Sequence, residues 1–119
     1  MTKITFYKTE DGIYYGFRES GHAGFDDSGK DIICAALSAM TMLIINTVEV
    51  ALASDIDYKI DEESTDIEVL AKGALPKYES DKKKNYAIAS LLLGYYHQLH
   101  DMLEDYYEYL DVDEVVKQI

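Results

Sequence analysis

The most apolar stretch of the chain reads Ile32-Ile33-Cys34-Ala35-Ala36-Leu37-Ser38-Ala39-Met40-Thr41-Met42-Leu43-Ile44-Ile45-Asn46-Thr47-Val48 and contains no charged residue. It is too long for one strand and does not alternate, so we expect a helix over about residues 29–54. Because this helix is apolar on almost every side, several elements must cover it, such as a sheet on one side and a partner on the other. A long buried helix is therefore the centre of the predicted fold.

The same stretch also raises the question of a membrane span, which needs about 20 apolar residues. Four polar side chains interrupt it, those of Ser38, Thr41, Asn46 and Thr47, and neither end carries a basic cluster. We interpret it as a buried helix of a soluble protein and expect no membrane partner.

Shorter elements are predicted on both sides of this helix. Residues 3–9 and 13–19 alternate apolar and polar side chains around the turn Glu10-Asp11-Gly12, a pattern typical of a β-hairpin. Two further alternating runs, residues 56–60 and 67–71, follow the helix and predict a second strand pair.

A second helix is predicted over residues 82–104, with a cap at Ser80 or Asp81. A last strand is expected around residues 107–112, although residues 111–114 fit a frayed end equally well. The predicted fold is thus α/β of the α+β type, with a β-hairpin, a long buried helix, a second strand pair, a second helix and a C-terminal strand. We expect one layered domain over residues 1–119.

Charge and cysteine content limit the classes of partner and location. Eleven Lys and Arg stand against 23 Asp and Glu, and the net charge of −12 argues against nucleic acid and favours a basic partner. The single cysteine cannot form an internal disulfide, and residues 1–8 alternate like a strand rather than forming the apolar core of a signal peptide. We therefore expect a cytoplasmic location.

Cys34 and His22 form a candidate catalytic pair. We expect Cys34 in the first turn of the long helix, where the positive end of the helix dipole favours a thiolate. His22 lies in a polar, glycine-rich segment, residues 19–30, which is predicted to be a loop and from which it could act as general base. A cysteine that only fills space in an apolar helix fits the spacing as well.

A resemblance favours catalysis. Gly21-His22-Ala23-Gly24, Gly29 and the run Asp31-Ile32-Ile33-Cys34-Ala35-Ala36-Leu37-Ser38-Ala39 resemble the signature of the ribosomal-processing cysteine proteases, the Prp family. The resemblance covers nearly the whole chain and places Cys34 and His22 at the family's catalytic positions.

This resemblance implies a site-specific cysteine endopeptidase, a thiol protease without a cofactor, that acts in ribosome biogenesis. Its implied substrate is the basic N-terminal leader of a large-subunit ribosomal protein, the one numbered twenty-seven, cut after an aromatic residue. It also implies a cytoplasmic homodimer. The alternatives are a non-catalytic, ribosome-associated binding module with a buried structural cysteine, and a thiol redox sensor, although the chain has no resolving cysteine.

Two neighbours of Cys34 are candidate supporting residues. Asp31 and Ser38 lie three residues before and four after it, a spacing that places all three on one helix face. Asp31 either caps the helix or holds His22 in the productive tautomer. Ser38 either donates a hydrogen bond to the thiolate or the scissile carbonyl, or bonds a backbone carbonyl of its own helix.

The loop that carries His22 is expected to bind substrate. Its candidate residues are Gly21, Gly24, Phe25 and Gly29, whose glycines reach conformations that other residues avoid. We expect the loop to close over bound substrate and Phe25 to cover the aromatic side chain. A plain surface loop that contributes only His22 is the alternative.

Four further residues have the spacing of metal ligands on a helix, namely His97, His100, Asp101 and Glu104. They lie opposite the predicted apolar face of the second helix. We therefore expect them to be solvated and predict no metal site.

Overall fold

The computed structural model describes residues 1–21, 28–64 and 66–119, and the side chains of all of these except 28–31. The elements follow in the order β1 (Thr2–Lys8), β2 (Tyr14–Ser20), α1 (Ser28–Asn46), β3 (Asp57–Ile60), β4 (Ile67–Leu70), α2 (Lys82–Tyr106) and β5 (Leu110–Val116). A π-helical segment, η1 (Thr47–Ala51), extends α1, and a short 3-10 turn, η2 (Lys72–Ala74), follows β4. The predicted α+β architecture is confirmed.

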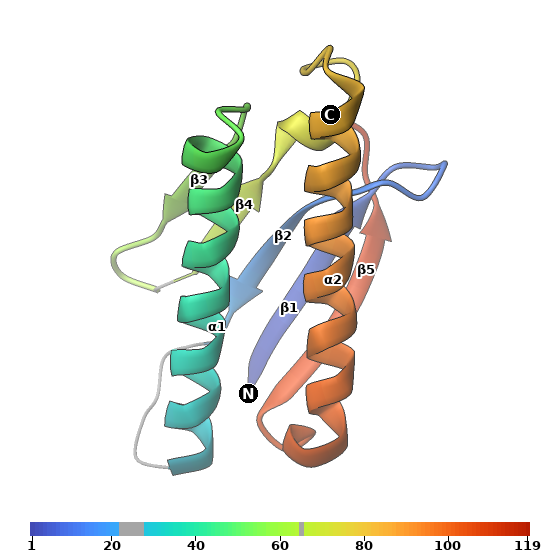
Figure 1. Ribbon diagram of the computed structural model, residues 1–119. Coiled ribbons are helices and arrows are strands. Elements are labelled where there is room, and N and C mark those ends of the chain that lie inside the picture. The colour runs from blue at the N-terminus through green and yellow to red at the C-terminus, as the bar shows by residue number, and fades with distance from the viewer. Residues whose placement is uncertain (22–27, 65) are drawn as a thin grey trace.

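The strands form one sheet in the order β3-β4-β2-β1-β5. Neighbouring strands are antiparallel except for β1 and β5, which run parallel from the Thr2/Leu110 pair to the Lys8/Val116 pair. Both helices lie on the same face of this sheet, side by side along its length (Figure 1). The molecule therefore has two layers, a sheet and a helix pair.

The local signals placed most of these elements within one or two residues. The hairpin turns at Gly12, whose φ of +87° is favourable only for glycine, and Asp81 caps α2 by accepting a hydrogen bond from the Lys83 backbone N–H at 2.9 Å. The last strand was predicted too early, and the frayed end was wrong. Because α2 continues to Tyr106, β5 begins only at Leu110, and residues 111–114 pair with β1.

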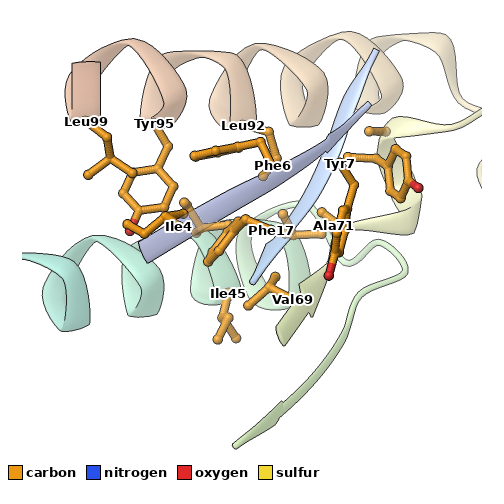
Figure 2. Packing of buried hydrophobic residues seen from close by; sticks show 14 of the residues in the cluster. Ile4, Phe6, Tyr7, Phe17, Ile45, Val69, Ala71, Leu92, Tyr95 and Leu99 are labelled. Carbon is orange, nitrogen blue, oxygen red and sulfur yellow. The ribbon is translucent and has the colours of Figure 1, made fainter. Parts of the chain in front are cut away.

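The core lies between the sheet and the helices. Figure 2 shows Ile4, Phe6 and Phe17 of the central strands facing Tyr95 and other residues of α2. The Phe6 ring meets the Tyr95 ring edge to face, with centroids 5.6 Å apart. From α1, the fully or almost fully buried side chains of Ile33, Leu37 and Ile44 complete the cluster, together with Val48 of η1.

On the other face of α1, the described part of the chain leaves several large apolar side chains exposed. They include Ile32, Met42 and Leu43, and Val50 of η1 continues them. The expected sheet covers one side of α1, and the expected partner on its other side stays a prediction. Residues 32–51 have the length and hydropathy of a membrane span, but a core helix of a soluble protein passes the same test, and α1 packs on the sheet as such a helix does.

Candidate active site

Cys34 lies on the helix that packs over the sheet. Its neighbours Ile33 and Leu37 are fully buried, whereas the Cys34 side chain is partly exposed. Packing of the two apolar neighbours fixes the helix against the core and leaves the thiol at the border of the covered face. The thiol is therefore not fully buried, although the interpretation of Cys34 as a buried structural cysteine required full burial.

The expected position of Cys34 in the first turn is also wrong. Helix α1 begins at Ser28, so Cys34 is its seventh residue and lies in the second turn. The polar residues at the start of the helix resemble a loop in sequence, yet they are helical. Because the dipole effect falls off within the first turn, the helix N-terminus contributes little to activation of this thiol.

Asp31 and Ser38 are on the same helix as Cys34, as predicted. Ser38 follows one turn later with an exposed side chain, on the same side of α1 as the thiol. Asp31 is the fourth residue of α1, so it is inside the helix and cannot be the capping residue before its first turn. Of the two roles considered for Asp31, the cap is therefore wrong.

The predicted base and most of the predicted substrate loop lie outside the described residues. These are His22, Gly24 and Phe25. At the end of the loop, Gly29 is part of α1 rather than of a loop.

Gly21 marks the point where the chain leaves the sheet. It follows the last residue of β2 and has a φ of +82°. A Cβ atom at this position would lie 2.3 Å from the Met1 carbonyl oxygen. Only glycine fits both conditions, so the backbone that leads to His22 starts from a fixed place beside β1.

A buried polar cluster of Glu19, Thr41 and Tyr95 was not predicted, and its Glu19 lies on β2 two residues before Gly21. The Glu19 side chain is fully buried on the helix-covered face of β2, where its Oε1 accepts hydrogen bonds from Thr41 Oγ1 of α1 at 2.8 Å and from the Tyr95 hydroxyl of α2 at 2.6 Å. Burial and the neighbouring Glu19 carboxylate raise the pKa of Tyr95 well above its usual range. The strand alternation that buries Phe17 also buries Glu19, and this was the available signal.

The four-residue candidate metal cluster of α2 is on the solvent side of the helix. His97, His100, Asp101 and Glu104 are all exposed, and the ring of Tyr96 contacts both histidines. Within the described residues, His, Cys, Asp and Glu side chains form no group of three that could hold a metal ion.

Comparison with known families identifies the chain. A family model described as cysteine protease Prp matches residues 1–111, a range that includes both Cys34 and His22. The chain belongs to the Prp family. It is therefore a cysteine protease, a hydrolase, as the resemblance of its motifs implied.

Solved structures share the Prp fold over almost their whole length. SMU.848 from Streptococcus mutans has a TM-score of 0.74 and 26% identity, covering 98% of this chain and 96% of that one. Two S. aureus structures of the essential ribosomal processing protease Prp, with a substrate peptide and with a covalently linked product peptide, have TM-scores of 0.78 and 0.73 at 17% identity. Each alignment covers 97% of this chain and 100% of theirs. A comparison with curated proteins gives no match.

Proposed function

We propose that this Prp-family protease is a ribosomal-processing endopeptidase. Its substrate is the N-terminal extension of the large-subunit ribosomal protein numbered twenty-seven, which it cuts after an aromatic residue. The observation that carries this proposal is the family match over residues 1–111 together with an accessible cysteine on α1. A net charge of −12 suits a basic ribosomal protein, because opposite charges steer the two molecules together.

In the proposed mechanism Cys34 is the nucleophile and His22 is the general base. The imidazole takes the thiol proton, and the sulfur attacks the carbonyl carbon of the scissile peptide bond. The protonated imidazole then gives its proton to the leaving amine, and an acyl-enzyme remains. Water, deprotonated by the same imidazole, attacks the thioester carbonyl and releases the free carboxylate and the thiol.

The place of Cys34 in the second turn makes His22 the main source of activation. A cationic imidazole beside the thiol favours the thiolate, whereas the helix N-terminus lies too far away to do so. Asp31 serves in this proposal to orient His22, since a carboxylate on the free imidazole nitrogen fixes its tautomer. Ser38 donates a hydrogen bond to the thiolate or to the scissile carbonyl.

Substrate binding is assigned to the segment that carries His22. Gly21, Gly24, Phe25 and Gly29 belong to this proposal, with Phe25 covering the aromatic side chain before the cut. Hydrogen exchange over residues 20–30 in an inactive Cys34→Ala variant tests the closure of this segment. Saturating leader peptide is expected to increase protection there, and unchanged protection contradicts it.

A homodimer in the cytoplasm completes the proposal. The outer face of α1 exposes large apolar side chains, among them Met42 and Leu43, and a groove of about 310 Å³ between α1 and α2 is lined in part by Met40, Leu43, Leu91 and Tyr95. Large exposed apolar patches mark interaction sites. A second copy of the chain would cover this face.

Mass spectrometry of a cleavage reaction tests the function. The purified chain is incubated with the full-length ribosomal protein, and one new N-terminus after an aromatic residue is expected. Cys34→Ala should show no cleavage while keeping the fold, because a partly exposed side chain leaves no cavity. Cys34→Ser should be strongly impaired, since a hydroxyl is far less acidic and less nucleophilic than a thiol.

A chemical control uses the fact that Cys34 is the only cysteine in the sequence. Iodoacetamide therefore blocks this one thiol in the unmutated chain, and the alkylated protein should lose cleavage in proportion to the fraction modified. Cleavage retained by Cys34→Ala, or by the fully alkylated chain, would rule out the proposed mechanism.

A further inference from the structure

Glu19 is a buried carboxylate near the end of β2, three residues before His22 in the sequence, and it bonds the helix that carries Cys34. The side chains of Glu19, Thr41 and Tyr95 are 0%, 3% and 5% exposed, and one carboxylate oxygen accepts both hydroxyl hydrogen bonds. The bonds join the end of β2 to α1 and α2, both of which contribute to the apolar core against the sheet. This cluster is thus a polar link inside an apolar core.

The link is close in sequence to both catalytic positions. Only Ser20 and Gly21 separate Glu19 from His22. Ser20 pairs with Lys3 in the sheet, and Gly21 has no space for a side chain beside the Met1 carbonyl. On the helix, Thr41 lies seven residues after Cys34, about two turns along the same face and about 10 Å along the axis.

A carboxylate is a costly choice for this position. Burying a polar group lowers stability unless it is hydrogen-bonded, and an apolar side chain of similar volume often gives equal or greater stability. Directional bonds, however, allow fewer relative positions of strand and helix than apolar contacts do, because a hydroxyl must point at the oxygen. The cluster therefore fixes the relative position of strand and helix rather than adding stability.

We propose that Glu19 is a positioning residue of the protease, which fixes the start of the segment bearing His22 against the helix bearing Cys34. Among the described residues, Thr41 and Tyr95 anchor its carboxylate. The proposal rests on the proposed function, since it concerns the distance between the thiol and its base. Misplacement of such a pair by about 1 Å can cost about a hundredfold in rate.

The central variant is Glu19→Met, which keeps the volume and removes the acceptor. We expect its urea midpoint of unfolding to be equal to or higher than that of the unmutated chain. For cleavage of the ribosomal leader, we expect a kcat lower by about tenfold or more and a KM within about twofold. Glu19→Gln retains an acceptor oxygen for both hydroxyls and should keep kcat within about threefold. If Glu19→Met keeps its stability but loses kcat, and Glu19→Gln keeps its kcat, the role of Glu19 is not merely structural.

Thr41→Val and Tyr95→Phe test the same link without touching Glu19, and they carry the test if Glu19→Met does not fold. Each deletes one hydroxyl and is expected to lower kcat in the same direction. The matched control is Tyr14→Phe, because the Tyr14 hydroxyl also donates to a carboxylate, that of Glu114, which lies on the edge strand β5 beyond β1. It should leave kcat unchanged.

Alkylation of Cys34 by iodoacetamide across pH gives a readout that is independent of substrate. The pH dependence of the alkylation rate should shift toward that of His22→Ala in three variants, namely Glu19→Met, Thr41→Val and Tyr95→Phe. It should not shift in Tyr14→Phe. If His22→Ala itself leaves cleavage and alkylation unchanged, the proposed mechanism and this inference both fail. If His22→Ala abolishes cleavage but Glu19→Met and both hydroxyl deletions match the unmutated chain, only the positioning role is overturned.

Discussion

Asp31 lies one turn before Cys34, where the first N–H groups of α1 have no helical partner. A carboxylate in this turn interacts favourably with the helix dipole, an effect of about 0.3–1 kcal/mol at most exposed sites. The same carboxylate is close enough in sequence to serve the catalytic pair. Measuring the free energy of unfolding and the turnover of a variant therefore separates the effect of Asp31 on the helix from its effect on catalysis.

Asp31→Asn is expected to lower kcat for leader cleavage by about tenfold or more, because an amide no longer holds His22 in one tautomer. The free energy of unfolding in urea should fall by less than about 1 kcal/mol. Adding Ser38→Ala to the Asp31→Asn variant, and comparing the loss of kcat with the sum of the two single losses, shows whether the two side chains are coupled. A turnover per folded molecule equal to that of the unmutated chain would remove Asp31 from the mechanism.

Gly21→Ala is expected to destabilise the protein more than Gly12→Ala. Both positions have positive φ, which costs an alanine about 1 kcal/mol, but a Cβ at Gly12 meets nothing within 4 Å. At Gly21 it meets the Met1 carbonyl, whose neighbour Thr2 is held by a hydrogen bond to Tyr109. The clash should add about 1–3 kcal/mol in urea unfolding. Equal losses for the two variants would mean that Met1 moves aside freely.

Between the strands, tyrosine hydroxyls and glutamates form links across the sheet. Tyr7 of β1 donates to Glu68 of β4 at 2.9 Å, which spans the intervening strand β2. At the other edge, Tyr14 and Lys8 both contact Glu114 of β5, and these partners hold the pKa of Glu114 below its usual value. Such links add directional contacts to the backbone ladders.

Tyr7→Phe tests one of these links through its pH dependence. Burial and the bond to Glu68 raise the pKa of Tyr7 to about 12, above its unfolded value of about 10. A raised pKa means that the contribution of this hydroxyl is full below about pH 10 and is lost as the pH rises toward 12. The variant should be less stable by about 1 kcal/mol at pH 7, and its stability should converge with that of the unmutated chain at high pH.

Urea unfolding at a series of pH values measures this convergence. Tyr86→Phe is the control, since the Tyr86 side chain is 78% exposed on α2. It should match the unmutated chain throughout. A stability difference for Tyr7→Phe that stays constant up to pH 12 would show that the hydroxyl contributes nothing that titrates.

Predictions from sequence succeeded where the cause is local. The hairpin, both helices and the Asp81 cap depend on neighbouring side chains, and each was predicted to within a few residues. Cys34 was placed one turn too early because the apolar run begins only at Ile32, although the helix begins with polar side chains from Ser28. Glu19 was missed because an acidic residue is normally assigned to the surface, and only its partners from two distant helices make burial tolerable.

For the molecule as a whole, the two-layer arrangement leaves apolar side chains on the outer side of α1 exposed among the described residues, with Leu43 61% exposed. The sequence predicts that a partner covers this side, but the identity of the partner depends on a surface rather than on a local pattern. The molecular mass of the protein in solution tests whether a second copy of the chain covers this side.

Leu43→Asp is expected to convert a homodimer into a monomer, or to weaken it by about tenfold or more, because a charge at the centre of an apolar interface is not solvated. Sedimentation velocity at micromolar concentration measures this. Ile60→Asp is the matched control, since Ile60 is 59% exposed but lies on β3 at the edge of the sheet. A monomeric unmutated chain, or equal weakening by both variants, would contradict the assignment of the interface to α1.

The parallel pairing of β1 with β5 has a consequence for the protein during its own synthesis. During translation β1 leaves the ribosome long before β5, the strand that covers one side of it, because both helices and the other strands lie between them in the sequence. Until then β1 is an open edge, a template on which other chains can pair. Contacts so distant in sequence also form slowly. A nascent chain stalled before residue 110 should therefore be prone to aggregate and to recruit chaperones, while one released after β5 should fold without them.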